Sequence, residues 1–139
     1  MVATVASAQA APASTVVIKV KSVSTSGVLH DRPPKGLSKG DVYAGRDNLT
    51  NVVPQFGKPV GAVVGSDQST LTLTSATTGR VTGIARFPGG TVTFSGQGKL
   101  GANARLSVVG GTGRYAGARG TLITGSGDSP LNTYRLALP

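Results

Sequence analysis

The chain has 139 residues, no cysteine and no glutamate, and its 14 lysines and arginines against five aspartates give a formal net charge of +9. This length suits one domain with one hydrophobic core, and the missing cysteines exclude disulfides and thiolate chemistry. With 21 glycines, 8 prolines and abundant Thr, Ser and Val, the composition disfavours amphipathic helices and predicts an all-β protein.

The positive charge is scattered along the chain, and Lys19 with Lys21 comes closest to a cluster. Three Tyr and three Phe offer few rings for stacking on bases, so we expect solvated strand faces rather than a specific nucleic-acid partner. The single histidine, His30, is interpreted as a surface residue, because a metal site or a Ser/His/Asp triad needs several partners. No apolar segment reaches the length of a membrane span.

The first fifteen residues carry no charged side chain. Ala8-Gln9-Ala10 followed by Ala11-Pro12 resembles a signal-peptidase site with cleavage after Ala10, which would make the protein secreted. The alternative is a disordered, low-complexity arm. In both interpretations residues 1–14 precede a folded domain over residues 15–139.

Further along the chain, alternating residues predict short strands bounded by turn residues. The strands are expected over residues 16–23, 41–49, 60–66, 70–75, 81–87, 91–96, 106–109, 120–124 and 133–138. Residues 24–39, with His30-Asp31-Arg32 and the Pro33-Pro34 pair, predict a long loop, and residues 67–69 and 88–90 predict hairpin turns. Short, even spacing favours closure into a barrel, which removes sheet edges.

Alternation also predicts which side chains share a face of the sheet. An eight-stranded barrel either fills its interior with these side chains or holds one small ligand, and the sequence leaves both open. The expected ligand-contacting residues are Asp41, Leu71, Leu73, Val92, Phe94, Leu106 and Leu136.

Residues 108–121 place two paired glycines, Tyr115 and two further glycines between apolar runs. A phosphate-binding P-loop would end in Gly-Lys-Ser/Thr before an apolar helix, whereas here Arg-Tyr-Ala-Gly-Ala-Arg-Gly follows and its glycines disfavour a helix. We therefore predict a strand, a tight corner with Tyr115 packed over it, and a second strand.

The sequence Val-Val-Gly-Gly-Thr-Gly-Arg-Tyr-Ala-Gly-Ala-Arg-Gly at 108–120 resembles the signature of the dirigent and allene oxide cyclase barrel superfamily, particularly its small bacterial dirigent-like members. Supporting stretches follow the order of that superfamily at residues 39–43, 47–50, 64–68 and 89–96. The resemblance implies a single eight-stranded antiparallel up-and-down β-barrel. It also implies self-association through the barrel exterior as a homotrimer, which would cover Val17, Val63 and Ile84.

The resemblance further points to a catalytic residue. In plant dirigent proteins an acidic residue precedes a Leu-Thr pair after the second strand, and Asp47-Asn48-Leu49-Thr50 matches this pattern. Asp47 is therefore the main catalytic candidate, with Tyr43 on the same strand face and the hydroxyl of Tyr134 as further candidates. The competing interpretation makes Asp47 a turn former or a partner of Arg46.

The chain also departs from these families. Its first strand lacks the His-Asp pair of plant dirigent proteins and the Glu of the cyclases, and Ala104 stands where plant dirigent proteins have an Arg, with Arg105 shifted to the other face. These departures argue against allene oxide cyclase activity.

Two functions are left. In the first, the barrel binds a small apolar organic molecule and steers a cyclisation or stereoselective coupling with no metal or cofactor. In the second, it is a non-catalytic secreted binding or structural module for anionic cell-envelope or extracellular ligands. An open cavity with Asp47 in its wall favours the first function, and a filled interior favours the second.

Overall fold

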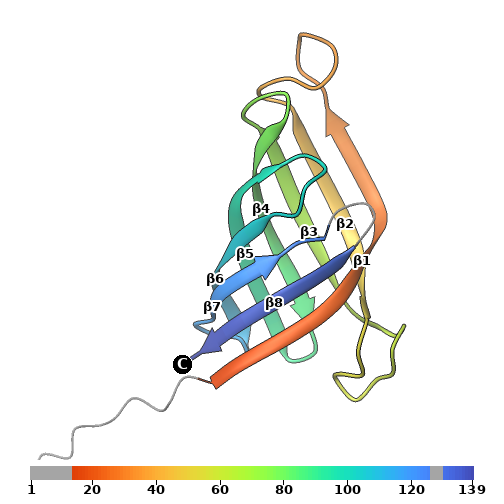
Figure 1. Cartoon of the computed structure of the whole chain (residues 1–139), viewed down its shortest axis with the longest axis vertical. Helices are drawn as coiled ribbons and strands as arrows, with labels where there is room; N and C mark the ends of the chain where they lie inside the picture. The colour runs from red at the N-terminus through yellow and green to blue at the C-terminus, as the bar shows by residue number, and fades with distance from the viewer. Residues whose placement is uncertain (1–13, 126–129) are drawn as a thin grey trace, which may run out of the picture.

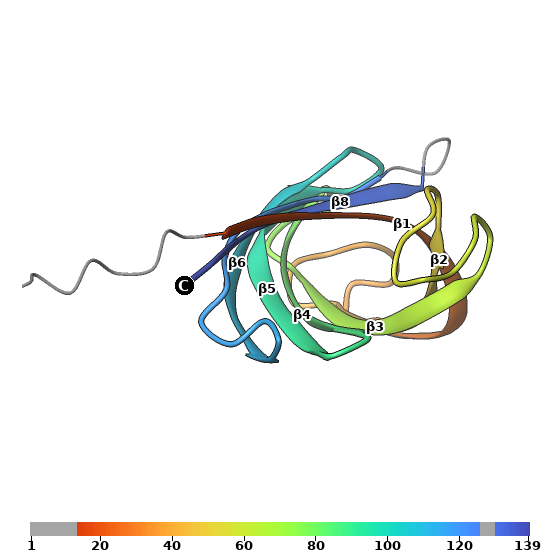
Figure 2. The same ribbon diagram turned by 90° about the horizontal axis from the view of Figure 1, so that it is seen from below.

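The computed structural model describes residues 14–125 and 130–139, so the expected export remnant or arm (residues 1–14) lies outside the described residues except for Ser14, the first residue of a strand. Eight strands follow in chain order: β1 (Ser14–His30), β2 (Val42–Asn51), β3 (Val63–Leu73), β4 (Thr78–Phe87), β5 (Gly90–Lys99), β6 (Arg105–Gly113), β7 (Arg119–Ile123) and β8 (Leu131–Leu138). Each pairs antiparallel with the next, and β8 returns to β1, which closes the barrel (Figures 1 and 2). The predicted all-β, eight-stranded up-and-down barrel is confirmed. No helix in the described part of the chain has the length and apolarity to cross a membrane.

Strand β1 closes the barrel because it pairs with two neighbouring strands, β8 and β2. Its first half, from Ser14 to Lys21, pairs with β8, and its second half, from Val20 to His30, pairs with β2. Beyond Lys21 the strand therefore has β2 alone as its partner, and β1 to β4 extend past the other strands at the upper end of Figure 1. The inner face of these strands is uncovered at that end.

Two local predictions are wrong. The turn expected at residues 67–69 lies in the middle of β3, because pairing with both β2 and β4 overrides the turn preference of Asp-Gln-Ser. The loop expected from residue 24 begins only after His30, since residues 26–30 pair with β2 beyond a bulge at Thr25. Both corrections lengthen the strands that form the extended end of the barrel.

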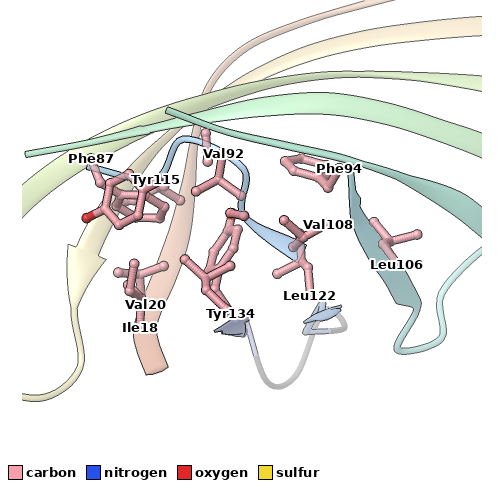
Figure 3. Close-up of a cluster of buried hydrophobic side chains, with 14 of the residues drawn as sticks. Ile18, Val20, Phe87, Val92, Phe94, Leu106, Val108, Tyr115, Leu122 and Tyr134 are labelled. Atoms are coloured by element: carbon pink, nitrogen blue, oxygen red, sulfur yellow. The ribbon is translucent and has the colours of Figure 1, made fainter. Parts of the chain in front are cut away.

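The lower half of the barrel is filled by aromatic rings. Phe87 meets Tyr134 edge-on with ring centroids 5.1 Å apart and stacks on Phe56 at 5.9 Å, while Phe94 contacts Tyr134 at 6.5 Å. Figure 3 shows Tyr134 pointing from β8 into the middle of this cluster. Burial of each such ring contributes about 1.5–3 kcal/mol, so this half acts as the core of the domain.

The glycine-rich stretch forms the predicted corner between β6 and β7. Gly113 has a φ of 60°, a value that favours glycine, and the chain turns there before β7 starts at Arg119. Tyr115 is fully buried at the corner and its hydroxyl donates to the carbonyl of Pro88 at 3.3 Å. The corner is structural, as expected.

Adjacent glycines at this corner allow a matched test. A Cβ added to Gly111 would lie 2.6 Å from the carbonyl oxygen of Thr91 and still closer to that of Tyr115, whereas one on Gly110 would meet nothing nearer than Arg119 at 4.0 Å. We expect Gly111→Ala to lower the free energy of unfolding by about 1–3 kcal/mol, because backbone must move to admit the methyl group. Gly110→Ala should stay near the wild type in urea denaturation, and equal losses for both variants would contradict this packing.

On the outside, Val17 and Val63 are exposed and Ile84 is half-buried. These side chains are available for contact between barrels. Assembly as a homotrimer stays a prediction.

Candidate functional site

Above the aromatic cluster the barrel holds an open cavity of about 260 Å³. Its apolar wall includes Val81, Phe94, Leu106 and Leu122. Its polar wall includes Ser22, Asp47, Asp67, Ser69, Thr124 and Asn132. The interior is thus only partly filled, and Asp47 lies in the wall of the open part.

Two carboxyl groups lie side by side in the polar wall of the cavity. Asp47 on β2 and Asp67 on β3 are directly paired in register, and Asp67 is only 8% exposed. Burial raises the pKa of Asp67 to about 8, and its hydrogen bond with Asp47 and the negative charge of Asp47 act in the same direction. At neutral pH the two groups therefore share one proton, which gives the cavity a donor and an acceptor side by side.

Two buried polar atoms near this pair have no hydrogen-bond partner among the described residues, Asp67 Oδ1 and the Tyr134 hydroxyl. Burial raises the pKa of Tyr134 well above its ordinary value, and the charges of Asp67 and Asp47 add to the effect, so the hydroxyl stays protonated. An unpartnered buried polar atom costs about 1–3 kcal/mol unless a ligand or water satisfies it. Asp67 lines the cavity, so its Oδ1 is available to a bound molecule, whereas Tyr134 is fully buried behind the lining residues.

Asn132, by contrast, is held in place by protein groups. Its Nδ2 donates to Ser22 Oγ, and its Oδ1 accepts from the backbone of Gly125 at 3.0 Å. This amide therefore links β1, β8 and the start of the β7–β8 connection in the cavity wall. Within residues 14–125 and 130–139, no group of three or more His, Asp, Cys or Glu side chains is arranged to hold a metal ion.

A second, apolar pocket of about 380 Å³ lies at the extended end of the barrel. Its lining consists of Leu29, Leu37, Tyr43, Leu71, Leu73 and Leu100. Along β3 the inward positions run from Asp67 and Ser69 in the cavity to Leu71 and Leu73 in this pocket. Leu29 is 49% and Leu37 55% exposed, so an apolar surface borders the polar cavity and is open to solvent.

The structure brings several of the predicted site residues together. Asp47, Phe94 and Leu106 line the cavity, and the hydroxyl of Tyr134 is near the carboxyl pair. Tyr43, Leu71 and Leu73 line the apolar pocket instead. Val92 and Leu136 are fully buried members of the packed core.

Asp41 lies outside the cavity and the apolar pocket, where it binds backbone groups of a loop. Its Oδ1 accepts from the backbone of Arg32 at 2.7 Å and its Oδ2 from that of Ser38 at 3.0 Å. The hydrogen bond from Arg32 is the main cause that lowers the pKa of Asp41, and the bonds from Ser38 add to it. Asp41 thus braces the loop between β1 and β2 and lines neither pocket.

Asp67 was missed as a site residue, because Asp-Gln-Ser suggested a turn. A signal was nevertheless present, since Asp67, Ser69, Leu71 and Leu73 alternate along one strand face. Treating residues 63–73 as one strand would have placed this carboxyl on the same face of the sheet as Ser69, Leu71 and Leu73.

The sequence matches the family described as Dirigent-like protein over residues 4–134. The chain belongs to the dirigent-like family. A search of curated proteins gave no match. The family resemblance of residues 108–120 is therefore confirmed.

Solved structures share the fold of this dirigent-like barrel. A pyocyanin demethylase aligns with a TM-score of 0.74 and 22% identity over 89% of this chain and 100% of its own. A pterocarpan synthase dirigent protein aligns with a TM-score of 0.66 and 18% identity over 91% and 90%. The Diels-Alderase AbmU from Streptomyces koyangensis aligns with a TM-score of 0.67 and 16% identity over 96% and 72%. At these identities the likeness establishes a common barrel and leaves the activity to the site.

Proposed function

We propose that this dirigent-like barrel binds a small, largely apolar organic molecule and steers its cyclisation or coupling through the Asp47–Asp67 pair. One observation carries the proposal: two interacting carboxyl groups lie in the wall of an open cavity whose other described lining residues are uncharged. A ligand that fills the cavity and reaches the leucines beyond it would be held in one conformation, which sets which atoms react.

The pair supplies acid and base at once. In a ring closure by addition, Asp67 donates its proton to the atom that gains electron density, while Asp47 removes a proton from the nucleophilic group as the new bond forms. The pair ends with one proton, as it began, after that proton passes back from Asp47 to Asp67. The product is an isomer of the substrate, so the step needs no oxidant or reductant.

The fold supports the proposal by analogy. Solved barrels of this architecture include a pterocarpan synthase dirigent protein and Diels-Alderases, whose names describe ring-forming chemistry. The rival, a non-catalytic module for anionic polymers, is favoured by a filled interior, and the cavity of about 260 Å³ speaks against that condition.

A thermal-shift screen of small apolar metabolites tests the proposal. Ser69→Leu places a bulky side chain inside the cavity, and Gln68→Leu places the same side chain at the exposed neighbouring position on β3. A true ligand should raise the melting temperature of the wild type and of Gln68→Leu by mass action, and have little effect on Ser69→Leu.

Products are then analysed by chiral chromatography and mass spectrometry after incubation with each hit. Conversion of a hit to a ring-closed isomer or a coupled product supports the steering function. Hits that also stabilise Ser69→Leu, or hits that emerge unchanged, would contradict it.

A further inference from the structure

The charge inside the barrel is opposite to the charge outside it. All 14 Lys and Arg side chains are exposed, and none of them lines the cavity. Among the described residues that line the cavity, the ionisable ones are Asp47 and Asp67. A protein with a formal net charge of +9 therefore encloses an acidic site.

Among the described residues, no counter-ion lies on the inner side of the pair. The side chains that the other strands turn toward it are neutral: Ser22 from β1, Val81 from β4, Phe94 from β5, Leu106 from β6, Leu122 from β7, and Asn132 and Tyr134 from β8. Arg46 and Arg86 occupy outward positions beside the pair and line a second groove, to which Asp47 and Asp67 also contribute. The described residues that line the cavity thus include no cation.

We infer that the ligand group seated against Asp47 and Asp67 carries a positive charge, as a quaternary or protonated nitrogen on an otherwise apolar molecule. The inference rests on the proposed ligand-binding function and deepens it. A carboxylate or phosphate in the cavity would face like charge with no cation among the described lining residues to accept it, and the free-energy cost of burying such an anion is high. A cation gains two acceptors, including the unpartnered Asp67 Oδ1.

The rest of the site fits such a molecule. The ring of Phe94 lines the same cavity and offers a face for a cation. The leucine-lined pocket at the extended end takes the apolar remainder of the ligand. The ligand class is therefore a small amphiphile with one cationic centre.

A fixed positive charge weakens the hold of the pair on its shared proton. The cation therefore binds the fully ionised pair more tightly than the singly protonated pair, and the singly protonated pair that the ring closure uses still offers it one carboxylate. Because protons compete with the ligand, its affinity rises with pH until the pair is fully ionised above pH about 8. An uncharged ligand leaves the proton in place, so its affinity shows no such rise.

Two isosteric probes separate these cases, benzyltrimethylammonium and the uncharged neopentylbenzene. Binding to the full chain is followed by ligand-observed NMR between pH 6 and 9 near physiological ionic strength, where the exterior charge is screened. At pH 8 we expect benzyltrimethylammonium to bind at least about tenfold more tightly than neopentylbenzene. Below pH 8 the affinity of the cation should rise by up to about tenfold for each pH unit. Asp67→Asn should remove the pH dependence, and Asp31→Asn, which changes an exposed carboxylate outside both pockets, should leave it intact.

The outcomes distinguish the two proposals. If neopentylbenzene binds as tightly as the cation at every pH, the charge inference is wrong while the ligand-binding function stands. If neither probe binds, the cavity is no ligand site and the proposed function falls with the inference. A pH dependence that persists in Asp67→Asn also overturns the assignment to this pair.

Discussion

Raising the pH from about 5 to about 9 is expected to destabilise the barrel, and Asp67→Asn to remove much of that loss. The pKa of Asp67 is about 8 in the folded protein and about 3.8 in the unfolded chain. Between these values the folded state binds the proton and the unfolded state does not, so stability is present below pH about 4 and is lost as the pH rises through about 8. The full difference corresponds to an upper bound of about 5–6 kcal/mol, which solvent contact and coupling to Asp47 reduce to a few kcal/mol.

Thermal denaturation across this pH range measures the effect. At about 4 °C per kcal/mol for a domain of this size, the melting temperature of the wild type should fall by on the order of 10 °C more than that of Asp67→Asn. Asp31→Asn controls for the loss of a carboxylate at the exposed surface and should follow the wild type. If the melting temperatures of the wild type and Asp67→Asn change with pH in parallel, Asp67 does not hold a proton in the folded protein and the prediction is wrong.

Asp47→Asn is expected to reduce turnover about a hundredfold or more while the barrel keeps its fold. The substitution is nearly isosteric but removes the base, and a positioned proton-transfer group contributes about 10²–10⁴-fold. Turnover is measured with a hit that the ligand screen identifies and the wild type converts. If Asp47 served only the local backbone, Asn would make the same hydrogen bonds and turnover would stay unchanged.

The pH profile adds a readout that a structural role would not move. Because protonated Asp67 acts as the acid, wild-type turnover should fall as the pH rises through about 8. Asp67→Asn should lose turnover at all pH values, while Tyr134→Phe shows whether the buried hydroxyl contributes. Asp31→Asn should retain both the rate and the profile.

The barrel was predictable from the sequence because its signals are local. Alternation in β5, β6 and β8 and the glycine corner at residues 108–120 each specify a strand or a turn by themselves. The extent of β1 and β3 was not predictable in this way. Residues such as Asp67 and Ser26 favour turns in isolation, and only pairing on both sides keeps β3 extended.

The same difference between local and long-range signals explains which residues of the site could be predicted from the sequence. Asp47 was found because it belongs to a short motif, and the resemblance assigned it a role. Its partner Asp67 belongs to the next strand, and the register of two strands was needed to bring the carboxyl groups together. The split of the predicted apolar residues between cavity, outer pocket and core likewise depends on how far each strand extends.

The double pairing of β1 also determines the order in which the protein can form. Ser14 lies opposite Leu138, so the seam that closes the barrel joins the two ends of the domain. During synthesis β2 to β5 can pair as successive hairpins as soon as they emerge, but the free edge of β1 waits for the last strand to be made. The acidic pair between β2 and β3 thus assembles from neighbouring segments, while the water-excluding enclosure that raises the pKa of Asp67 arises only when the final strand docks.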